Sequence, residues 1–250
     1  MPSESIVRAL HAARPGATSA ALARAGSYER LWKKVEERLA ARVLDLACGD
    51  HPIPGAIGCD LSHEELARST GLRVQGRAQA LPFADGSFDA ALCHLAFMLF
   101  DDIETVVGEL HRVLAPGATF HALLGGGPVA DGPDYSDAFH AFAQLMPKAD
   151  PLGDPRSKSP AGWRALFAPR RPGGSGPSES SGWSEPAFER WELDLTGTFD
   201  DVWLFLGASY QLRESDRIKR ELRVRFPDDP VPCKIAAYYA CVTRLDSVRR

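Results

Sequence analysis

The sequence has no long hydrophobic run. Nowhere among its 250 residues is there a stretch approaching the roughly 20 uninterrupted apolar residues that a membrane-spanning helix needs. Residues 1–14 are polar and lack the apolar core of a signal peptide. We therefore expect a cytoplasmic protein that has no membrane partner.

The sequence also lacks cysteine motifs. It has an odd number of cysteines, and none of them stands in a CxxC pair or at a Cys/His metal-ligand spacing. Neither a disulfide framework nor a metal site is expected, and we predict reduced, mostly buried thiols. These cysteines are Cys48, Cys59, Cys93, Cys233 and Cys241.

An excess of positive charge is missing as well. The formal net charge is -4, the isoelectric point is about 6.0, and the Lys and Arg residues are scattered along the chain. Because binding to a polyanion needs clustered basic side chains, nucleic acid is not expected as a partner.

The apolar residues, 44% of the chain, are enough for the core of one α/β domain. Helical periodicity covers residues 3–39, and residues 103–114 form a second apolar helical face that ends at Pro116-Gly117. Short apolar runs bounded by turn residues predict strands at 42–46, 56–60, 72–75, 88–95, 119–124, 188–193 and 233–243.

Strands that alternate with helices predict a doubly wound sheet, whose ligand crevice lies beyond the carboxyl ends of the strands. Residues 126–186 differ in composition, being rich in Gly, Pro, Ser and Asp, and 170–182 is expected to be a loop. Aromatic residues at 135–142 and 163–167 predict short helices over the crevice. We therefore divide one domain, 1–250, into N-terminal helices (1–40), a cofactor-binding half (41–125), a lid and substrate region (126–186) and C-terminal strands with a helix (187–250).

The run RVLDLACGD, residues 42–50, predicts a strand that ends in a turn of small residues. Small side chains there would let a ligand approach the backbone closely, and Asp60, at the end of the next strand, could accept hydrogen bonds from two ribose hydroxyls. The same pattern occurs in dinucleotide-binding enzymes and by chance, and Asp60 could instead cap a helix that begins near His63.

Residues 80–120 carry a more specific pattern. Leu-Pro-Phe at 81–83 is followed by Asp-x-Ser-Phe-Asp at 85–89 and by Glu-x-x-Arg-Val-Leu-x-Pro-Gly at 109–117. This combination resembles class I, Rossmann-like S-adenosylmethionine-dependent methyltransferases that act on small molecules. The resemblance implies about seven strands, mostly parallel with an antiparallel last strand. It also implies S-adenosyl-L-methionine as cofactor and S-adenosyl-L-homocysteine as product.

By this resemblance, Asp45 and Gly49 lie beside the methionine part of the cofactor, and Asp60 binds its ribose. His94 is the candidate catalytic base, although a histidine at a strand end often only makes hydrogen bonds. His140 and Tyr210 are weaker candidates. The complete set of candidate cofactor-binding residues is Tyr28, Asp45, Ala47, Cys48, Gly49, Asp60, Leu61, Ala78, Gln79 and His94.

Three features depart from the family pattern. Ala47 replaces the first glycine of the turn and the last glycine is missing. Only fifteen positions separate Asp45 from Asp60, and the prolines in 51–54 stand where a crossover helix would begin, so we predict that this helix is lost. The methionine carboxylate would then need another partner, such as Tyr28 or a basic side chain. Arg77 replaces the acid at the adenine side, which leaves the backbone of residues 78–79 to contact the base.

These observations predict methyl transfer from S-adenosylmethionine to a small, apolar or aromatic acceptor of the secondary-metabolite kind. One alternative keeps the fold and the cofactor in a binding, scaffold or non-methyl-transfer role. Another is an NAD(P)-dependent oxidoreductase, which would need a fuller glycine fingerprint than residues 47–50 provide. At residue level, Asp45 could equally be a buried structural acid and Tyr28 a core residue.

Overall fold

A computed structural model describes residues 3–37, 40–129, 137–168, 182–210 and 212–245. Its helices are α1 (Ser3–Ala13), α2 (Ala17–Leu22), α3 (Ser27–Glu36), α4 (His63–Leu66), α5 (Ile103–Val113), α6 (Ala138–Leu145), α7 (Pro160–Phe167), α8 (Phe199–Leu206) and α9 (Ser215–Arg225). Its strands are β1 (Val43–Leu46), β2 (Ile57–Asp60), β3 (Arg73–Gln75), β4 (Phe88–His94), β5 (Leu114–Pro128), β6 (Ala187–Asp194) and β7 (Lys234–Thr243). Most of the loop predicted at 170–182 lies outside the described residues.

The strands form one sheet in the order β3-β2-β1-β4-β5-β7-β6. β1 to β5 pair in parallel, whereas β7 runs antiparallel to both β5 and β6. The predicted mostly parallel sheet with an antiparallel last strand is therefore confirmed. The sequence pattern located these strands because the central ones are buried on both faces, as in β1, where every residue is buried.

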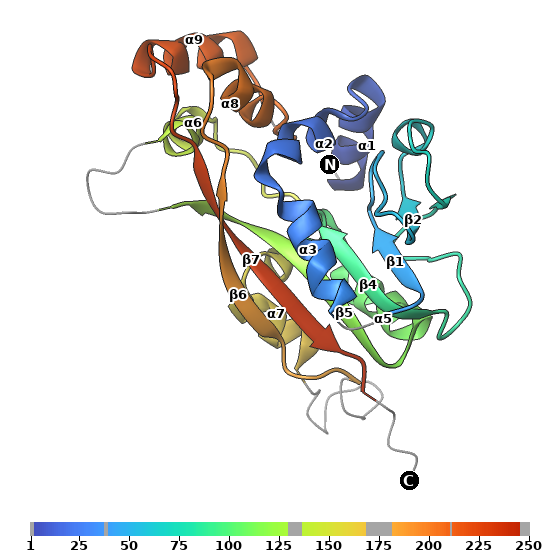
Figure 1. The fold of residues 1–250 in the computed structure, drawn as a ribbon. Coiled ribbons are helices and arrows are strands. Elements are labelled where there is room, and N and C mark those ends of the chain that lie inside the picture. The colour runs from blue at the N-terminus through green and yellow to red at the C-terminus, as the bar shows by residue number, and fades with distance from the viewer. Residues whose placement is uncertain (1–2, 38–39, 130–136, 169–181, 211, 246–250) are drawn as a thin grey trace.

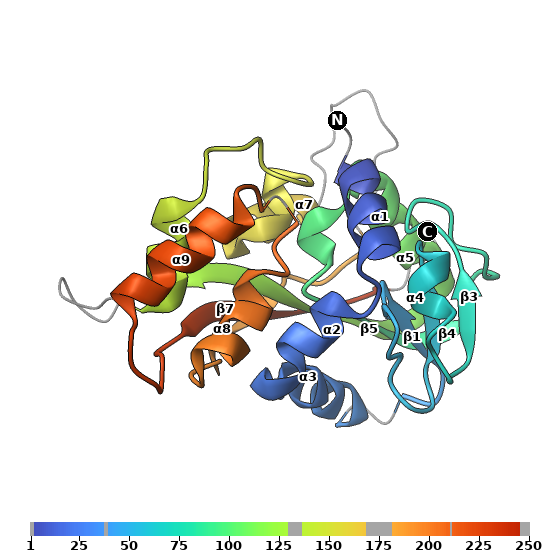
Figure 2. The ribbon, with the colours of Figure 1, turned by 90° about the horizontal axis from the view of Figure 1, so that it is seen from above.

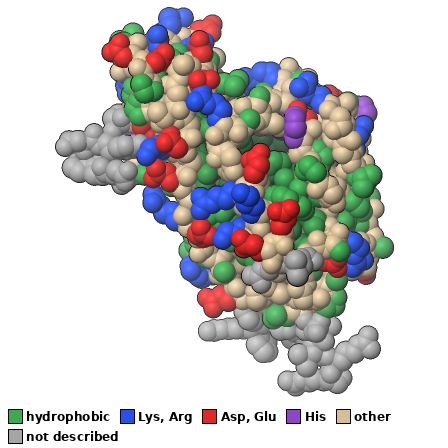
Figure 3. All heavy atoms as spheres, viewed as in Figure 1, with side chains coloured by type: hydrophobic (Ala, Val, Ile, Leu, Met, Phe, Trp, Pro, Cys, Tyr) green, Lys and Arg blue, Asp and Glu red, His purple; other side chains and the backbone are tan. Residues whose placement is uncertain are grey.

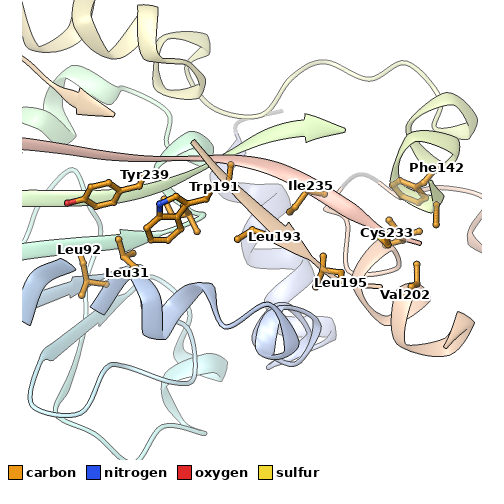
Figure 4. Close-up of a cluster of buried hydrophobic side chains, with 14 of the residues drawn as sticks. Leu31, Leu92, Phe142, Trp191, Leu193, Leu195, Val202, Cys233, Ile235 and Tyr239 are labelled. Carbon is orange, nitrogen blue, oxygen red and sulfur yellow. The ribbon is translucent and has the colours of Figure 1, made fainter. Parts of the chain in front are cut away.

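Helices cover both faces of the sheet (Figure 1). One hydrophobic cluster joins α3, α6, α8 and α9 to β4, β6 and β7. Figure 4 shows its centre, where the Trp191 and Tyr239 rings stack 5.5 Å apart and Leu31 of α3 lies close to Leu92 of β4.

The second cluster packs α5 and α7 on the opposite face. Trp163 of α7 is fully buried, stacks on Phe120 at 5.7 Å and donates from Nε1 to the Ser157 carbonyl at 3.0 Å. The prediction that 163–167 forms a helix over the crevice is therefore right about the helix and wrong about its place. The aromatic side chains of α7 bury themselves in the core instead.

The N-terminal region is helical but broken. Gly16, which follows Pro15, and Gly26 both have positive φ angles, of 78° and 58°, and separate α1, α2 and α3. The expected N-terminal helices are therefore present, and proline and left-handed glycine set the breaks between them because they interrupt the helical hydrogen bonds.

The predicted loss of the crossover helix is confirmed, since residues 47–56 contain turns and no helix. Pro52 and Pro54 have no N–H to give to a helix, and the Ile53 N–H donates to the Asp45 carboxylate at 2.9 Å. Within the described residues, no helix is both long and apolar enough to span a membrane.

Candidate active site

A cavity of about 660 Å³ lies at the carboxyl ends of β1, β2 and β4. α1 and α2 supply part of its wall, and residues of α6 and α8 supply another part. This is where a doubly wound sheet is expected to bind a ligand. Of the candidate cofactor-binding residues, the cavity is lined by Tyr28, Ala47, Cys48, Gly49, Asp60, Leu61, Ala78, Gln79 and His94.

Asp60 ends β2 at the cavity wall. Its Oδ2 accepts from the Gly49 N–H at 2.9 Å and its Oδ1 from the Ser62 N–H at 2.8 Å. Burial raises the pKa of this carboxyl, while the two backbone hydrogen bonds oppose that rise. The N-cap of α4 is Ser62 rather than Asp60. Each Asp60 oxygen keeps acceptor capacity, as ribose binding would require.

The turn after β1 is tight and strained. Ala47 has a φ of 56° and Gly49 a φ of 60°. The left-handed region favours glycine, which explains why glycine would suit position 47. Burial raises the pKa of the neighbouring Cys48 thiol far above its ordinary value, so this cysteine is protonated and packs as an apolar side chain.

Asp45 lies behind the cavity wall instead of lining it. Its side chain is fully buried, and its Oδ2 accepts from the Tyr28 hydroxyl and from the Ile53 N–H. Its Oδ1 has no hydrogen-bond partner, and burial raises the pKa of the carboxyl to about 7. The Tyr28 hydroxyl is donated to Asp45 in this structure, and its suggested role toward the methionine carboxylate stays a prediction.

His94 ends β4 and lines the cavity. Its Nε2 lies 2.8 Å from the Ser27 hydroxyl, and its ring centre is 4.8 Å from that of Tyr28. Burial lowers the pKa of the imidazole to about 4, which keeps it neutral at neutral pH and makes it a weak base. These contacts suit a hydrogen-bonding wall residue, and its catalytic role stays a prediction.

The adenine side of the expected cofactor site is organised by helix α1. Arg77 lines the cavity and donates from Nη2 to the Glu4 carboxylate of α1 at 2.7 Å. Gln79 donates from Nε2 to the Asp101 carbonyl at 2.8 Å, and the buried Ala78 lines the wall between them. Arg77 thus anchors α1 beside the cavity.

The motif at 109–117 has a structural role. Arg112 donates to the carbonyls of Leu81 and Phe83 at 2.9 and 2.7 Å, and Glu109 accepts from the Leu81 N–H at 2.6 Å. Arg112 also pairs with Glu109 through its Nε at 2.8 Å. The pair therefore holds the Leu-Pro-Phe turn, which follows directly on the cavity-lining residues 78–79.

The other end of the cavity is apolar. This end lies near β7, which is toward the opposite end of the strand order from β2 and its Asp60. Its lining residues come from α6, α8 and β7 and are Phe139, Phe142, Phe205, Leu206 and Ile235.

The two weaker catalytic candidates differ in their position relative to the cavity. His140 bonds to Gln144 on α6 and does not line the cavity. Tyr210 lines the cavity beside α1, where its hydroxyl lies 3.3 Å from His11 Nε2.

Sequence reasoning missed the cavity residues of α1 and α2. His11 and Gly16 line the wall, and both contact the buried carboxylate of Glu65. Nothing in the local sequence marks these residues, because their partners lie about fifty positions away.

No metal site emerges from the part of the chain that the structure describes, since no group there of three or more His, Cys, Asp or Glu side chains could hold an ion. All the cysteines are free and buried, as predicted.

Comparison with known proteins locates the similarity in the central segment. Residues 44–122 match a family model described as a methyltransferase domain. The chain is 40% identical over 100 residues to demethylmenaquinone methyltransferase of Thermus thermophilus, an alignment that covers 32% of this chain and 46% of the relative. It is 34% identical over 108 residues to malonyl-[acyl-carrier protein] O-methyltransferase of Enterobacter lignolyticus, covering 36% and 41%. The matched part is less than half of either relative.

Comparison with solved structures shows a similarity of fold that covers most of the chain. The YcgJ protein of Bacillus subtilis superposes with a TM-score of 0.56 at 18% identity, covering 88% of this chain and all of that one. The strand order and this likeness show a Rossmann-like fold, and the segment 44–122 at the centre of that fold is the part that matches the methyltransferase domain model.

Proposed function

We propose that the chain transfers a methyl group from S-adenosylmethionine to a small acceptor with an apolar or aromatic body. The observation that carries the proposal is a single cavity with two unlike ends. One end presents Asp60 and the small-residue turn at 47–49, and the other is lined by the aromatic side chains of α6 and α8.

The residues present fit this cofactor. Asp60 has free acceptor capacity for ribose hydroxyls, and the turn at 47–49 carries no side chain large enough to keep a ligand from the backbone. Asp45 lies behind this turn, where its carboxylate, when ionised, would attract the positively charged methionine end through the cavity wall. When bound, S-adenosylmethionine supplies a methyl group activated by its sulfonium.

The protein's own residues would orient the cofactor and the acceptor and enclose them away from water. Methyl transfer is an in-line displacement, so alignment and exclusion of water are the main requirements. The aromatic end would hold the acceptor beside the methionine end of the cofactor site and away from solvent. His94, neutral and bonded to Ser27, would position a reactant by hydrogen bonding.

The aromatic lining of the cavity and the mixed charge of the protein surface both support this acceptor class. Phe139, Phe142 and Phe205 suit a ring or an alkyl chain. On the face drawn in Figure 3, basic side chains lie among acidic ones, as in the pairs of Arg30 and Lys34 with Glu189. Such mixed charge favours a small molecule over a nucleic acid. One of the two relatives is named a demethylmenaquinone methyltransferase.

Calorimetric titration with S-adenosylmethionine and S-adenosylhomocysteine tests the cofactor. We expect binding by the wild type, loss of at least tenfold in affinity in Asp60→Ala, and unchanged affinity in Asp216→Ala. Asp216 is an exposed aspartate of α9 that does not line this cavity. A wild type that binds neither compound would overturn the proposal.

Transfer itself is tested with S-adenosylmethionine that carries a tritiated methyl group. The protein is incubated with separate panels of quinols, phenols, acyl thioesters and charged, hydrophilic acceptors, and label is counted in the purified acceptor of each panel. Label that enters only charged, hydrophilic acceptors would contradict the proposed acceptor class.

A further inference from the structure

Segments from distant parts of the chain meet at the Asp60 end of the cavity. Asp60 ends β2, Glu65 belongs to α4, His11 to α1, and Tyr210 follows α8. Figure 2 shows α1 lying beside α4, and the two helices are in contact. The wall next to the candidate ribose-binding acid is therefore built partly from the N-terminal helix.

Glu65 fixes the position of this helix. Its side chain is almost completely buried, and both of its carboxylate oxygens lie 3.0 Å from the Gly16 N–H, which donates to them. Its Oε1 is also hydrogen-bonded to His11 Nδ1. Because a buried carboxylate is stable only with such partners, Glu65 ties both α1 and the turn after it to α4.

The same contact orients His11. A carboxylate only accepts hydrogen bonds, so Nδ1 carries the proton that is donated to Glu65, and in the tautomer that carries this proton alone Nε2 is an acceptor. The Tyr210 hydroxyl lies 3.3 Å from that Nε2, longer than an ordinary O–H···N hydrogen bond. His11 and Asp60 both line the cavity.

We propose that His11 is a second recognition residue for the ribose, with its Nε2 accepting a hydrogen bond from one ribose hydroxyl while Asp60 accepts from the other. The proposal rests on S-adenosylmethionine being the ligand of this cavity. Ser3 and Glu4 already anchor the start of α1 through Asp101 and Arg77, so the histidine ring is not the helix's sole attachment. What His11 adds to the wall is its Nε2, which a ribose hydroxyl would bind in place of the distant Tyr210 hydroxyl.

A pair of variants separates recognition from anchoring. In His11→Asn the amide nitrogen takes the place of Nδ1 and can still donate to Glu65, but the acceptor at Nε2 is gone. In His11→Gln the amide reaches the place of Nε2, and the contact with Glu65 is lost. His63→Asn is the matched control, since His63 stands exposed on α4 and outside the cavity.

The measurement is calorimetric affinity for S-adenosylhomocysteine and for its 2′-deoxy and 3′-deoxy analogues. We expect His11→Asn to weaken binding of S-adenosylhomocysteine about tenfold, as for one hydrogen bond, and His11→Gln to recover part of this loss. For one of the two deoxy analogues, wild type and His11→Asn should bind equally, because that analogue lacks the hydroxyl that His11 contacts. His63→Asn should bind like the wild type.

Three results would overturn the inference. Equal affinity of wild type and His11→Asn for S-adenosylhomocysteine would show that Nε2 contacts no ribose hydroxyl. An equal loss for the parent compound and both deoxy analogues would show that His11 only holds α1 in place. If the wild type binds none of these compounds, the proposed function fails first, and this inference fails with it.

Discussion

The buried carboxyl of Asp45 makes a quantitative prediction about stability and pH. Burial raises the pKa of Asp45 to about 7, whereas in the unfolded chain an aspartate titrates near 3.9. Between these values the unfolded state loses its proton and the folded state keeps it. The folded state is therefore favoured most at low pH, and this contribution to stability is lost as the pH rises through about 7.

The size of the effect follows from the two pKa values. A shift of about three pKa units corresponds to roughly 4 kcal/mol in total, of which about 2–3 kcal/mol falls between pH 5 and pH 8. Asp45→Asn removes the ionisation and keeps an oxygen that can accept from Tyr28 and Ile53. The amide variant should therefore gain about 2–3 kcal/mol relative to the wild type over this pH range.

Urea unfolding of both proteins at half-unit intervals from pH 5 to pH 8 measures this difference directly. All other titrating groups are shared, so their contributions cancel in the comparison of the two proteins. A difference in unfolding free energy that stays constant with pH would refute the reasoning. It would mean that Asp45 is ionised throughout the range, or that water reaches it in the folded protein.

Further predictions concern the turn, the core, the motif and the ligand. Ala47→Gly should stabilise the protein by up to about 1 kcal/mol and Gly49→Ala should destabilise it by about 1–2 kcal/mol, since both positions have positive φ; urea midpoints that move the opposite way would contradict this. Trp163→Ala should cost about 3–5 kcal/mol in the same assay, and a loss below about 1 kcal/mol would mean that α7 is not core. Arg112→Met should weaken calorimetric binding of S-adenosylhomocysteine by freeing the turn that follows residues 78–79, and unchanged affinity would contradict that link. At pH 7, S-adenosylmethionine should release a fraction of a proton from Asp45 on binding, visible as a dependence of calorimetric heat on buffer; an equal dependence in Asp45→Asn would rule this out.

The elements that sequence patterns located share one property. The strands β1, β2 and β4 and helix α5 are marked by apolar residues whose spacing reflects burial of the element itself. The turn at 47–49 and the acid at Asp60 follow from their places at strand ends, which a parallel sheet brings to one edge. The loss of the crossover helix followed from two prolines.

Other features could not be found in this way. The aromatic pattern of 163–167 predicted a helix correctly, yet an apolar helix face does not specify which surface it will cover, and α7 packs in the core. Sequence patterns gave Arg77 at the adenine side no role, and the structure shows that it pairs with Glu4.

Sequence patterns thus sufficed for the fold class and for the residues contributed by strand ends, because these depend on local periodicity and on chain direction. The linkage of Tyr28 to Asp45, the contact of His11 with Glu65 and the apolar end of the cavity appear only in the folded chain. Each depends on how helices pack against the sheet, and that packing is set by the sum of many weak contacts between residues far apart in the sequence.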